Sequence, residues 1–153
     1  LQFNGWPDGT TLLMMACGKG NADVAKYLIT LGADPNDAGD DPDDADDDLP
    51  KKAPLHLAAL GGYEALTRWF VAECKADPHQ VDRNGSIAFH LAVIQGHQRI
   101  AQWFVDDVGI EVGIKDGSGA TALMWATRQG HVSLAQWLRE RMRIDIKAGT
   151  QTS

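Results

Sequence analysis

The sequence has few cysteines, no long apolar run and no general excess of positive charge, and each absence excludes a class of protein. Cys17 and Cys74 are too few and too far apart in the chain for a disulfide framework or a zinc site. No apolar run approaches the roughly 18 to 20 residues that span a bilayer, and the start lacks a basic-then-apolar signal pattern. We therefore expect a protein of the reducing cytoplasm that does not insert into a membrane.

The negative charge of the chain is concentrated in one segment. The formal net charge is −7, but eight aspartates lie between Asp37 and Asp48, and the remaining residues are close to neutral. A near-neutral body without a basic stripe does not fit a nucleic-acid groove, so we predict no nucleic-acid partner. Because its aspartates repel one another, segment 37–49 is predicted to be a disordered, solvated insertion. A docking site for a basic partner is the alternative for this segment.

Four stretches of the chain repeat one pattern: "GTTLLMMACGKGN", "APLHLAALGGY", "GSIAFHLAVIQGH" and "GATALMWATRQGH". The last two steps between them are equal, and the first is longer because the aspartate-rich segment adds residues. Each stretch predicts a short helix that ends at a glycine in the left-handed conformation, followed by a second helix such as "QRIAQWFVDD". Turn signals come next, at Asn84-Gly85 and Asp116-Gly117. The glycines that end the short helices are Gly20, Gly62, Gly96 and Gly130.

This pattern resembles the ankyrin repeat family, whose units of about 33 residues contain a turn and two helices. "APLHLAALGGY" is similar to the family signature T-P-L-H-x-A, and "LGADPN" is similar to the end of a repeat. The resemblance implies a single all-α domain over residues 1–153, an ankyrin-repeat solenoid of stacked helix-turn-helix units with hairpin-like turns. The expected repeats are 8–36, 50–79, 84–113 and 118–146. Because "IDIKAGTQTS" stops just before a further unit would begin, we also expect more repeats or domains of the same chain.

Aromatic residues on the second helices recur with the repeat. Trp69, Trp103 and Trp137 have the same place in successive units, and Tyr27 has that place in the first unit. They could form an aromatic ladder that binds a ligand. We favour the structural interpretation, in which each ring packs against the neighbouring unit, because no unit of a solenoid buries its apolar face alone.

Trp125 is the strongest candidate for a binding residue. It stands where the other units have Met15, Leu57 and Leu91, at a position that the ankyrin resemblance places on the inner-helix side of the stack. An indole is too large to be hidden beside small neighbours, so partner binding and core filling both remain open for it. Val93 and Ile94 would form an exposed apolar patch nearby. The other predicted partner-binding residues are Gln95, Arg128 and Gln129 on the short helices and Arg83, Asn84, Lys115 and Asp116 at the turn tips.

No motif in the chain points to catalysis, a metal or a cofactor. The histidines His56, His90, His97 and His131 recur at positions that resemble structural hydrogen-bonding sites of the family. Asn36, in "LITLGADPN", resembles asparagines of ankyrin repeats that are hydroxylated. The predicted function is a non-catalytic module that binds a protein segment or neighbouring domain through its concave face and turn tips. The alternatives are a rigid docking arm in a large assembly and a regulatory domain attached to an enzyme.

Overall fold

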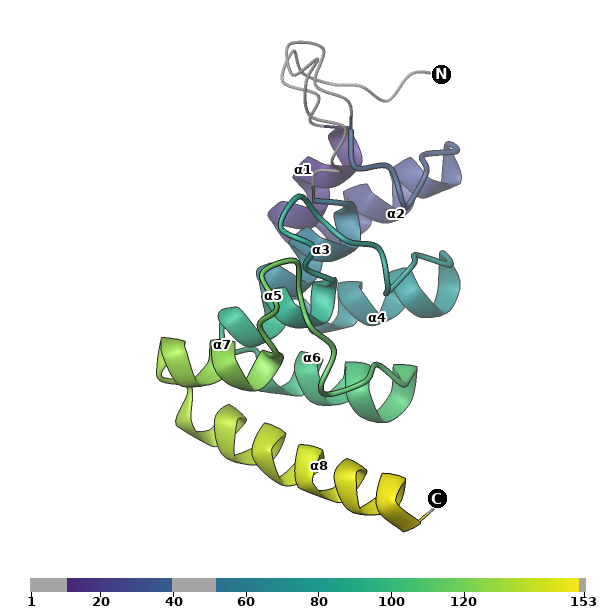
Figure 1. Ribbon diagram of the computed structural model, residues 1–153. Helices are drawn as coiled ribbons and strands as arrows, with labels where there is room; N and C mark the ends of the chain where they lie inside the picture. The colour runs from purple at the N-terminus through teal and green to yellow at the C-terminus, as the bar shows by residue number, and fades with distance from the viewer. Residues whose placement is uncertain (1–10, 40–51, 152–153) are drawn as a thin grey trace.

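Helices in pairs make up most of the chain. The computed structural model describes residues 11–39 and 52–151. The first, inner helix of each pair is short: α1 (Leu12–Gly18), α3 (Pro54–Leu60), α5 (Ala88–Ile94) and α7 (Ala122–Gln129). The outer helices are α2 (Ala22–Thr30), α4 (Glu64–Glu73), α6 (Gln98–Trp103), which the π-helix η1 (Phe104–Val108) continues, and α8 (Val132–Gln151). The pairs stack in chain order, with the inner helices forming one layer and the outer helices another (Figure 1). The predicted all-α solenoid is confirmed.

The signature histidines make one of the two hydrogen bonds of a capping box. His56 is the third residue of α3, and its Nδ1 atom accepts the backbone N–H of Ala53 at 3.0 Å, whereas Ala53 has no hydroxyl to cap the helix in return. The other ring nitrogen, Nε2, donates to the carbonyl of Ser86 in the next unit at 3.1 Å. Burial lowers the pKa of His56, although Asp82 acts in the opposite direction. The ring is therefore a neutral link between units, and His90 repeats the arrangement with Ile87 and Ile114.

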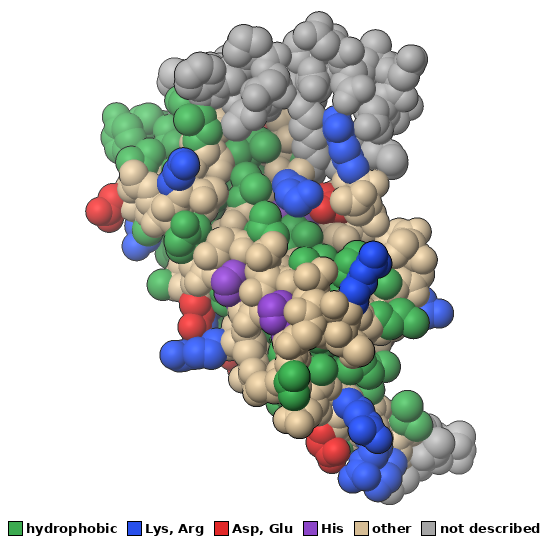
Figure 2. Space-filling view, turned by 90° about the vertical axis from the view of Figure 1, so that its left-hand side faces the viewer, with side chains coloured by type: hydrophobic (Ala, Val, Ile, Leu, Met, Phe, Trp, Pro, Cys, Tyr) green, Lys and Arg blue, Asp and Glu red, His purple; other side chains and the backbone are tan. Residues whose placement is uncertain are grey.

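Each unit also places a ring over a glycine of the unit before it. Gly62 and Gly96 have φ of +79° and +76°, and a Cβ atom there would meet the rings of His97 and His131 at 2.6 and 2.7 Å. The His131 ring is held in place because its Nε2 donates to the Ile94 carbonyl at 2.9 Å. Histidine side chains lie together on this face of the stack in Figure 2. These glycines therefore end the helix and also make room for the next unit.

Two glycine substitutions separate these roles. Gly130 has φ of +77°, like Gly96, but nothing lies within 4 Å of a Cβ atom there. We expect Gly130→Ala to lower the free energy of unfolding by about 1 kcal/mol through the left-handed backbone alone. Gly96→Ala should cost at least about 1 kcal/mol more, because the new methyl group displaces the hydrogen-bonded ring of His131. Urea unfolding of both variants measures the difference, and equal losses would show that the ring contact contributes little.

The tryptophans of the outer helices pack between units. Trp69 and Trp103 are half-buried against the core, and each lies under a cation of the preceding unit. Lys26 is 5.7 Å from the ring centre of Trp69, and the guanidinium of Arg68 is 5.7 Å from that of Trp103. Tyr27, in the first described unit, is 62% exposed. These contacts favour the packing interpretation over a ligand-binding ladder.

The second helix of the fourth unit is longer than those of the other units. The predicted repeat 118–146 ends inside α8, which is one continuous helix from Val132 to Gln151. The third unit leaves its helix at Gly109, whose φ is +89°. Arg143 has the corresponding place in the fourth unit and carries no left-handed signal, so the helix continues. An ion pair of 2.9 Å between Arg141 and Asp106 fixes α8 against η1.

Two other predictions concern the acidic insertion and the membrane. Most of the insertion 37–49 lies outside the described residues, so its disorder stays a prediction. Over residues 11–39 and 52–151, no helix has both the length and the apolar character needed to span a bilayer.

Candidate functional site

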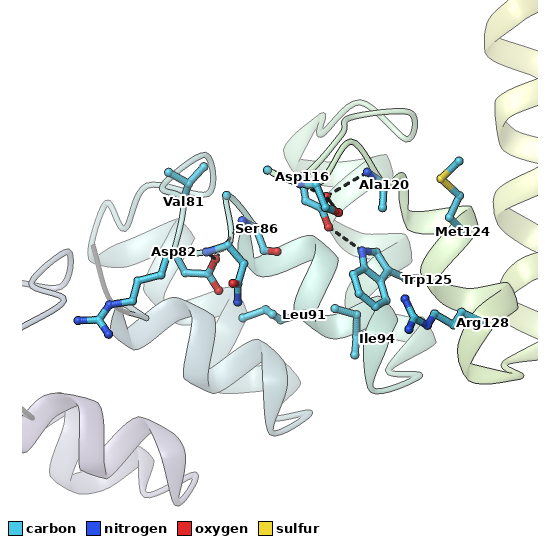
Figure 3. A pocket seen from close by; sticks show the side chains of 15 residues that line it. Val81, Asp82, Ser86, Leu91, Ile94, Asp116, Ala120, Met124, Trp125 and Arg128 are labelled. Atoms are coloured by element: carbon cyan, nitrogen blue, oxygen red, sulfur yellow. Dashed lines mark hydrogen bonds between the residues drawn. The ribbon is translucent and has the colours of Figure 1, made fainter. Parts of the chain in front are cut away.

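A groove runs between two neighbouring turns and the inner helices α5 and α7. One wall is the turn over residues 81–86, the other is the turn over 116–120, and the volume between them is about 970 Å³. Figure 3 shows Leu91 and Ile94 below the turns, with Trp125 standing beside the second turn. The apolar lining residues are Val81, Leu91, Ile94, Ala120, Met124 and Trp125. Such a concave, mostly apolar surface with a few fixed polar groups is typical of a binding site.

The two turns share one design and are joined to each other. In the first turn the Oδ1 atom of Asp82 accepts the backbone N–H groups of Asn84 and Ser86 at 2.9 and 3.0 Å. Asp116 does the same in the second turn, with the N–H groups of Ser118 and Ala120. The N–H of Gly117 then donates to the Asn84 carbonyl at 3.0 Å, so the turns support each other.

The second turn runs from Asp116 to Gly119, so the predicted dipeptide Asp116-Gly117 forms its first half. The left-handed residues are Gly85 and Gly119, with φ of +68° and +84°. The left-handed glycine of this turn is therefore Gly119 and not Gly117. The repeat explains the difference, because Gly119 has the same place in its unit as Gly85 has in the unit before.

Asp116 is a buried support for Trp125, whereas the prediction placed it on the exposed turn tip. Asp116 is 8% exposed, and its Oδ2 atom accepts the indole N–H of Trp125 at 2.7 Å (Figure 3). Burial raises the pKa of Asp116, but hydrogen bonds from Ser118, Trp125 and Ala120 outweigh it and hold the pKa below its ordinary value. The carboxylate is thus charged, and its bonds are used within the protein.

The corresponding carboxylate of the preceding unit has a different neighbour. Asp82 is 2% exposed, and its Oδ2 atom is buried without a hydrogen bond. Leu91, which has the place of Trp125 in this unit, has no side-chain N–H to offer it. The Lys52 ammonium lies 3.4 Å from this oxygen and balances its charge. The groove therefore has one turn fixed by an indole and one fixed by an ion pair.

Trp125 combines the two roles that the sequence left open. The ring is half-buried, packs against the core and lines the groove. Its N–H is bound by Asp116, so the indole presents only its apolar ring to the groove. The Arg128 guanidinium lies 5.6 Å from the ring centre and borders the same groove. A rigid aromatic with one exposed side is suited to contact a partner.

The structure gathers most of the predicted residues at the groove, but the expected exposure of Val93 is wrong. Val93 is 0% exposed and packs in the core between units, so it cannot form part of an exposed patch. Gln95, Lys115 and Gln129 are exposed but do not line the groove. The predicted residues that line it are Arg83, Asn84, Ile94, Asp116, Trp125 and Arg128.

Some lining residues were missed by the sequence reasoning. Leu91 could have been found from its register with Trp125, which puts both on the same side of the inner helices. Met124 has the place of the signature histidines His56 and His90, and no local signal marks it as exposed, yet it is 58% exposed.

Asn36 lies in the turn after α2 and does not line the groove. Its Oδ1 atom accepts the backbone N–H of Asp77 at 2.8 Å, and its carbonyl accepts from the side chain of Gln80 at 2.9 Å. The side chain thus ties one unit to the next. Its hydroxylation stays a prediction.

Comparison with known families identifies the fold. The family model described as ankyrin repeats (3 copies) matches residues 2–71 and 55–149, which together cover most of the chain. The chain belongs to the ankyrin repeat family, whose members generally serve as protein–protein interaction modules. No curated protein matches the chain. Among the described residues, no three His, Cys, Asp or Glu side chains come together as a metal site would require.

Proposed function

We propose that this chain is a non-catalytic interaction module that holds an extended protein segment in the groove between the turns 81–86 and 116–120. The observation that carries the proposal is the fixed indole of Trp125, which Asp116 holds at the edge of an apolar surface made by Leu91 and Ile94. Aromatic side chains in such positions often dominate the energy of a protein interface. Gln95, Lys115 and Gln129 are exposed beside the groove and would contact a longer segment.

Substitution of Trp125 tests the anchor. We expect Trp125→Ala to weaken partner binding at least about tenfold, because the partner loses its main apolar contact. It also leaves the Asp116 carboxylate without the indole N–H, so the free energy of unfolding should fall by about 1–3 kcal/mol. Affinity purification from the native lysate below the melting temperature identifies the partner, and titration with the purified partner measures its affinity.

Trp103→Ala serves as the matched control, because it removes the same side chain from the outer layer. This variant should lose stability but keep its partner. Recovery of the same proteins with wild type and Trp125→Ala would argue against the groove.

One observation favours the alternative of a rigid docking arm. The side of the fourth unit that faces away from the third is apolar at Leu123, Val132 and Ala135, and a shallow hollow of about 280 Å³ lies there. A further repeat or a neighbouring domain of the same chain would fit this side, which includes the case of an attached enzyme that the stack regulates. Equal recovery in the Trp125→Ala experiment would favour this function.

Two further proposals concern the chain as a whole. A cytoplasmic location is supported by the free thiols of Cys17 and Cys74, where burial raises the pKa of Cys17 to about 12. Hydroxylation of Asn36 is supported only by its sequence context, and mass spectrometry of the peptide that contains it would show the gain of one oxygen atom.

A further inference from the structure

We propose that the segment held in this groove carries an acidic side chain within two positions of a large apolar side chain, with the carboxylate bound by Arg128. The inference rests on the proposed function and names the ligand chemistry of the same site. Three observations support it: the accessible charges of the groove are positive, the indole of Trp125 offers only an apolar ring, and Trp125 and Arg128 are three positions apart on α7.

The accessible charges of the groove are positive although it contains two carboxylates. Asp82 and Asp116 are 2% and 8% exposed, and their oxygens serve the turns, Lys52 and Trp125. Arg128 is exposed at the groove, and Lys115 is exposed on the adjoining turn. A ligand entering from solvent therefore meets cations first, while the carboxylates remain covered.

Arg128 is available to bind an anion. Within the described part of the chain no carboxylate is paired with it, and its guanidinium lies 5.6 Å from the ring centre of Trp125. The guanidinium keeps its N–H donors, which match the two oxygens of a carboxylate. Its position against the ring also restricts where it points, so less side-chain entropy is lost when an anion binds.

The part of the groove next to Arg128 favours apolar groups. The indole N–H of Trp125 is already bound to Asp116, so the ring offers no donor to a ligand. Ile94 lies below it, and Leu91, which is 6% exposed, forms the floor of the groove. A large aliphatic or aromatic side chain would cover the ring and Ile94 and remove their exposed surface from water.

The distance between Trp125 and Arg128 determines how far apart the apolar and the acidic residue lie in the ligand. Trp125 and Arg128 are three positions apart on α7, so they lie on the same side of the helix, about 5–6 Å apart at their Cβ atoms. An extended chain advances about 3.3 Å per residue. The side chains that contact Trp125 and Arg128 therefore come from residues at most two positions apart.

The test uses a library of random dodecapeptides displayed on phage and selected against the intact chain. Wild type is compared with Trp125→Ala, Arg128→Glu and Arg99→Glu. Arg99→Glu is the matched control, because it makes the same change of charge on α6, where the Arg99 side chain is 82% exposed. Thermal melting confirms that each variant is folded at the selection temperature.

We expect wild type to enrich peptides with Asp or Glu within two positions of a large apolar residue. Their affinity should fall at least about tenfold in Arg128→Glu and should not change in Arg99→Glu. In Arg128→Glu the selection itself should turn to peptides with Lys or Arg at that place. The affinity of the acidic peptides for wild type should also decrease as salt increases.

Two results would overturn the inference, and they are distinguishable. Peptides that need Trp125 but lack an acidic residue, or bind Arg128→Glu as well as wild type, would refute the ligand chemistry and leave the proposed function standing. If no enriched peptide is lost with Trp125→Ala, or if none is enriched at all, the groove is not a peptide site, and both proposals fail.

Discussion

Trp103→Ala should lower the free energy of unfolding by about 3 kcal/mol, at the lower end of the range for a buried tryptophan because the ring is half-buried. The ring lies between units: its centre is 5.0 Å from that of Phe104, which is 0% exposed, and the guanidinium of Arg68 covers it at 5.7 Å. Removing it takes away an aromatic pair, a cation–π contact and part of the surface that joins the second and third units. Urea unfolding followed by circular dichroism measures the loss.

Tyr27→Ala is the control for this prediction. Tyr27 has the same place on an outer helix, but it is 62% exposed, so its removal should change stability by no more than about 0.5 kcal/mol. Partner binding at the groove should survive in both variants at temperatures where they are folded. Equal stability losses in the two variants would show that position on the helix, rather than contact between units, determines the effect.

The repeat period predicted the fold because each signal recurs at every unit. Apolar spacing, the glycines after the inner helices and the constant step between the later units all indicate the same stack, and the helix pairs follow it. The same register placed Trp125, Ile94 and Arg128 on the concave side, where they line one groove. In a repeat protein the contacts between units can be predicted from the sequence, because each unit contacts only its neighbours.

The errors arose where a residue's surroundings depend on the adjoining unit. Val93 was expected to be exposed, but the fourth unit packs over it, while Thr127, at the same place in that unit, is exposed. The burial of Asp116 was missed because a turn of polar residues usually faces solvent. Only the three-dimensional structure shows that the indole of Trp125, on the following helix, reaches back to this carboxylate.

The position of Trp125 therefore depends on a residue of another element. In the preceding unit Leu91 makes no bond to Asp82, and Lys52 balances that carboxylate instead. A single substitution in the repeat pattern, Leu to Trp, gives the last turn an extra connection and the groove its aromatic wall. Stability of the turn and shape of the site are thus coupled through Asp116.

Asp116→Ala should weaken both the turn and the site. It removes the acceptor of the Ser118 and Ala120 N–H groups and of the Trp125 indole N–H. We expect the free energy of unfolding to fall by about 2–3 kcal/mol, since several donors lose a charged partner together. Partner affinity should fall as well, because the ring is no longer fixed at the groove. Asp82→Ala is the comparison, because it disturbs the matching turn. Its affinity for the partner should fall less than that of Asp116→Ala, because no indole is held by Asp82.

Asp116→Asn removes the charge of the Asp116 side chain but keeps its shape. The dependence of stability on acid pH shows how much the charge contributes. The folded-state pKa of Asp116 lies below its ordinary value, so ionised Asp116 stabilises the fold. This contribution is complete above the unfolded-state pKa of about 3.9 and is lost as the pH falls from there through the folded-state pKa. The stability difference between wild type and Asp116→Asn should therefore be constant near neutral pH and shrink below about pH 4. Unfolding curves from neutral to strongly acidic pH measure it, and a difference that did not change with pH would mean that the carboxylate holds the indole by its shape and not by its charge.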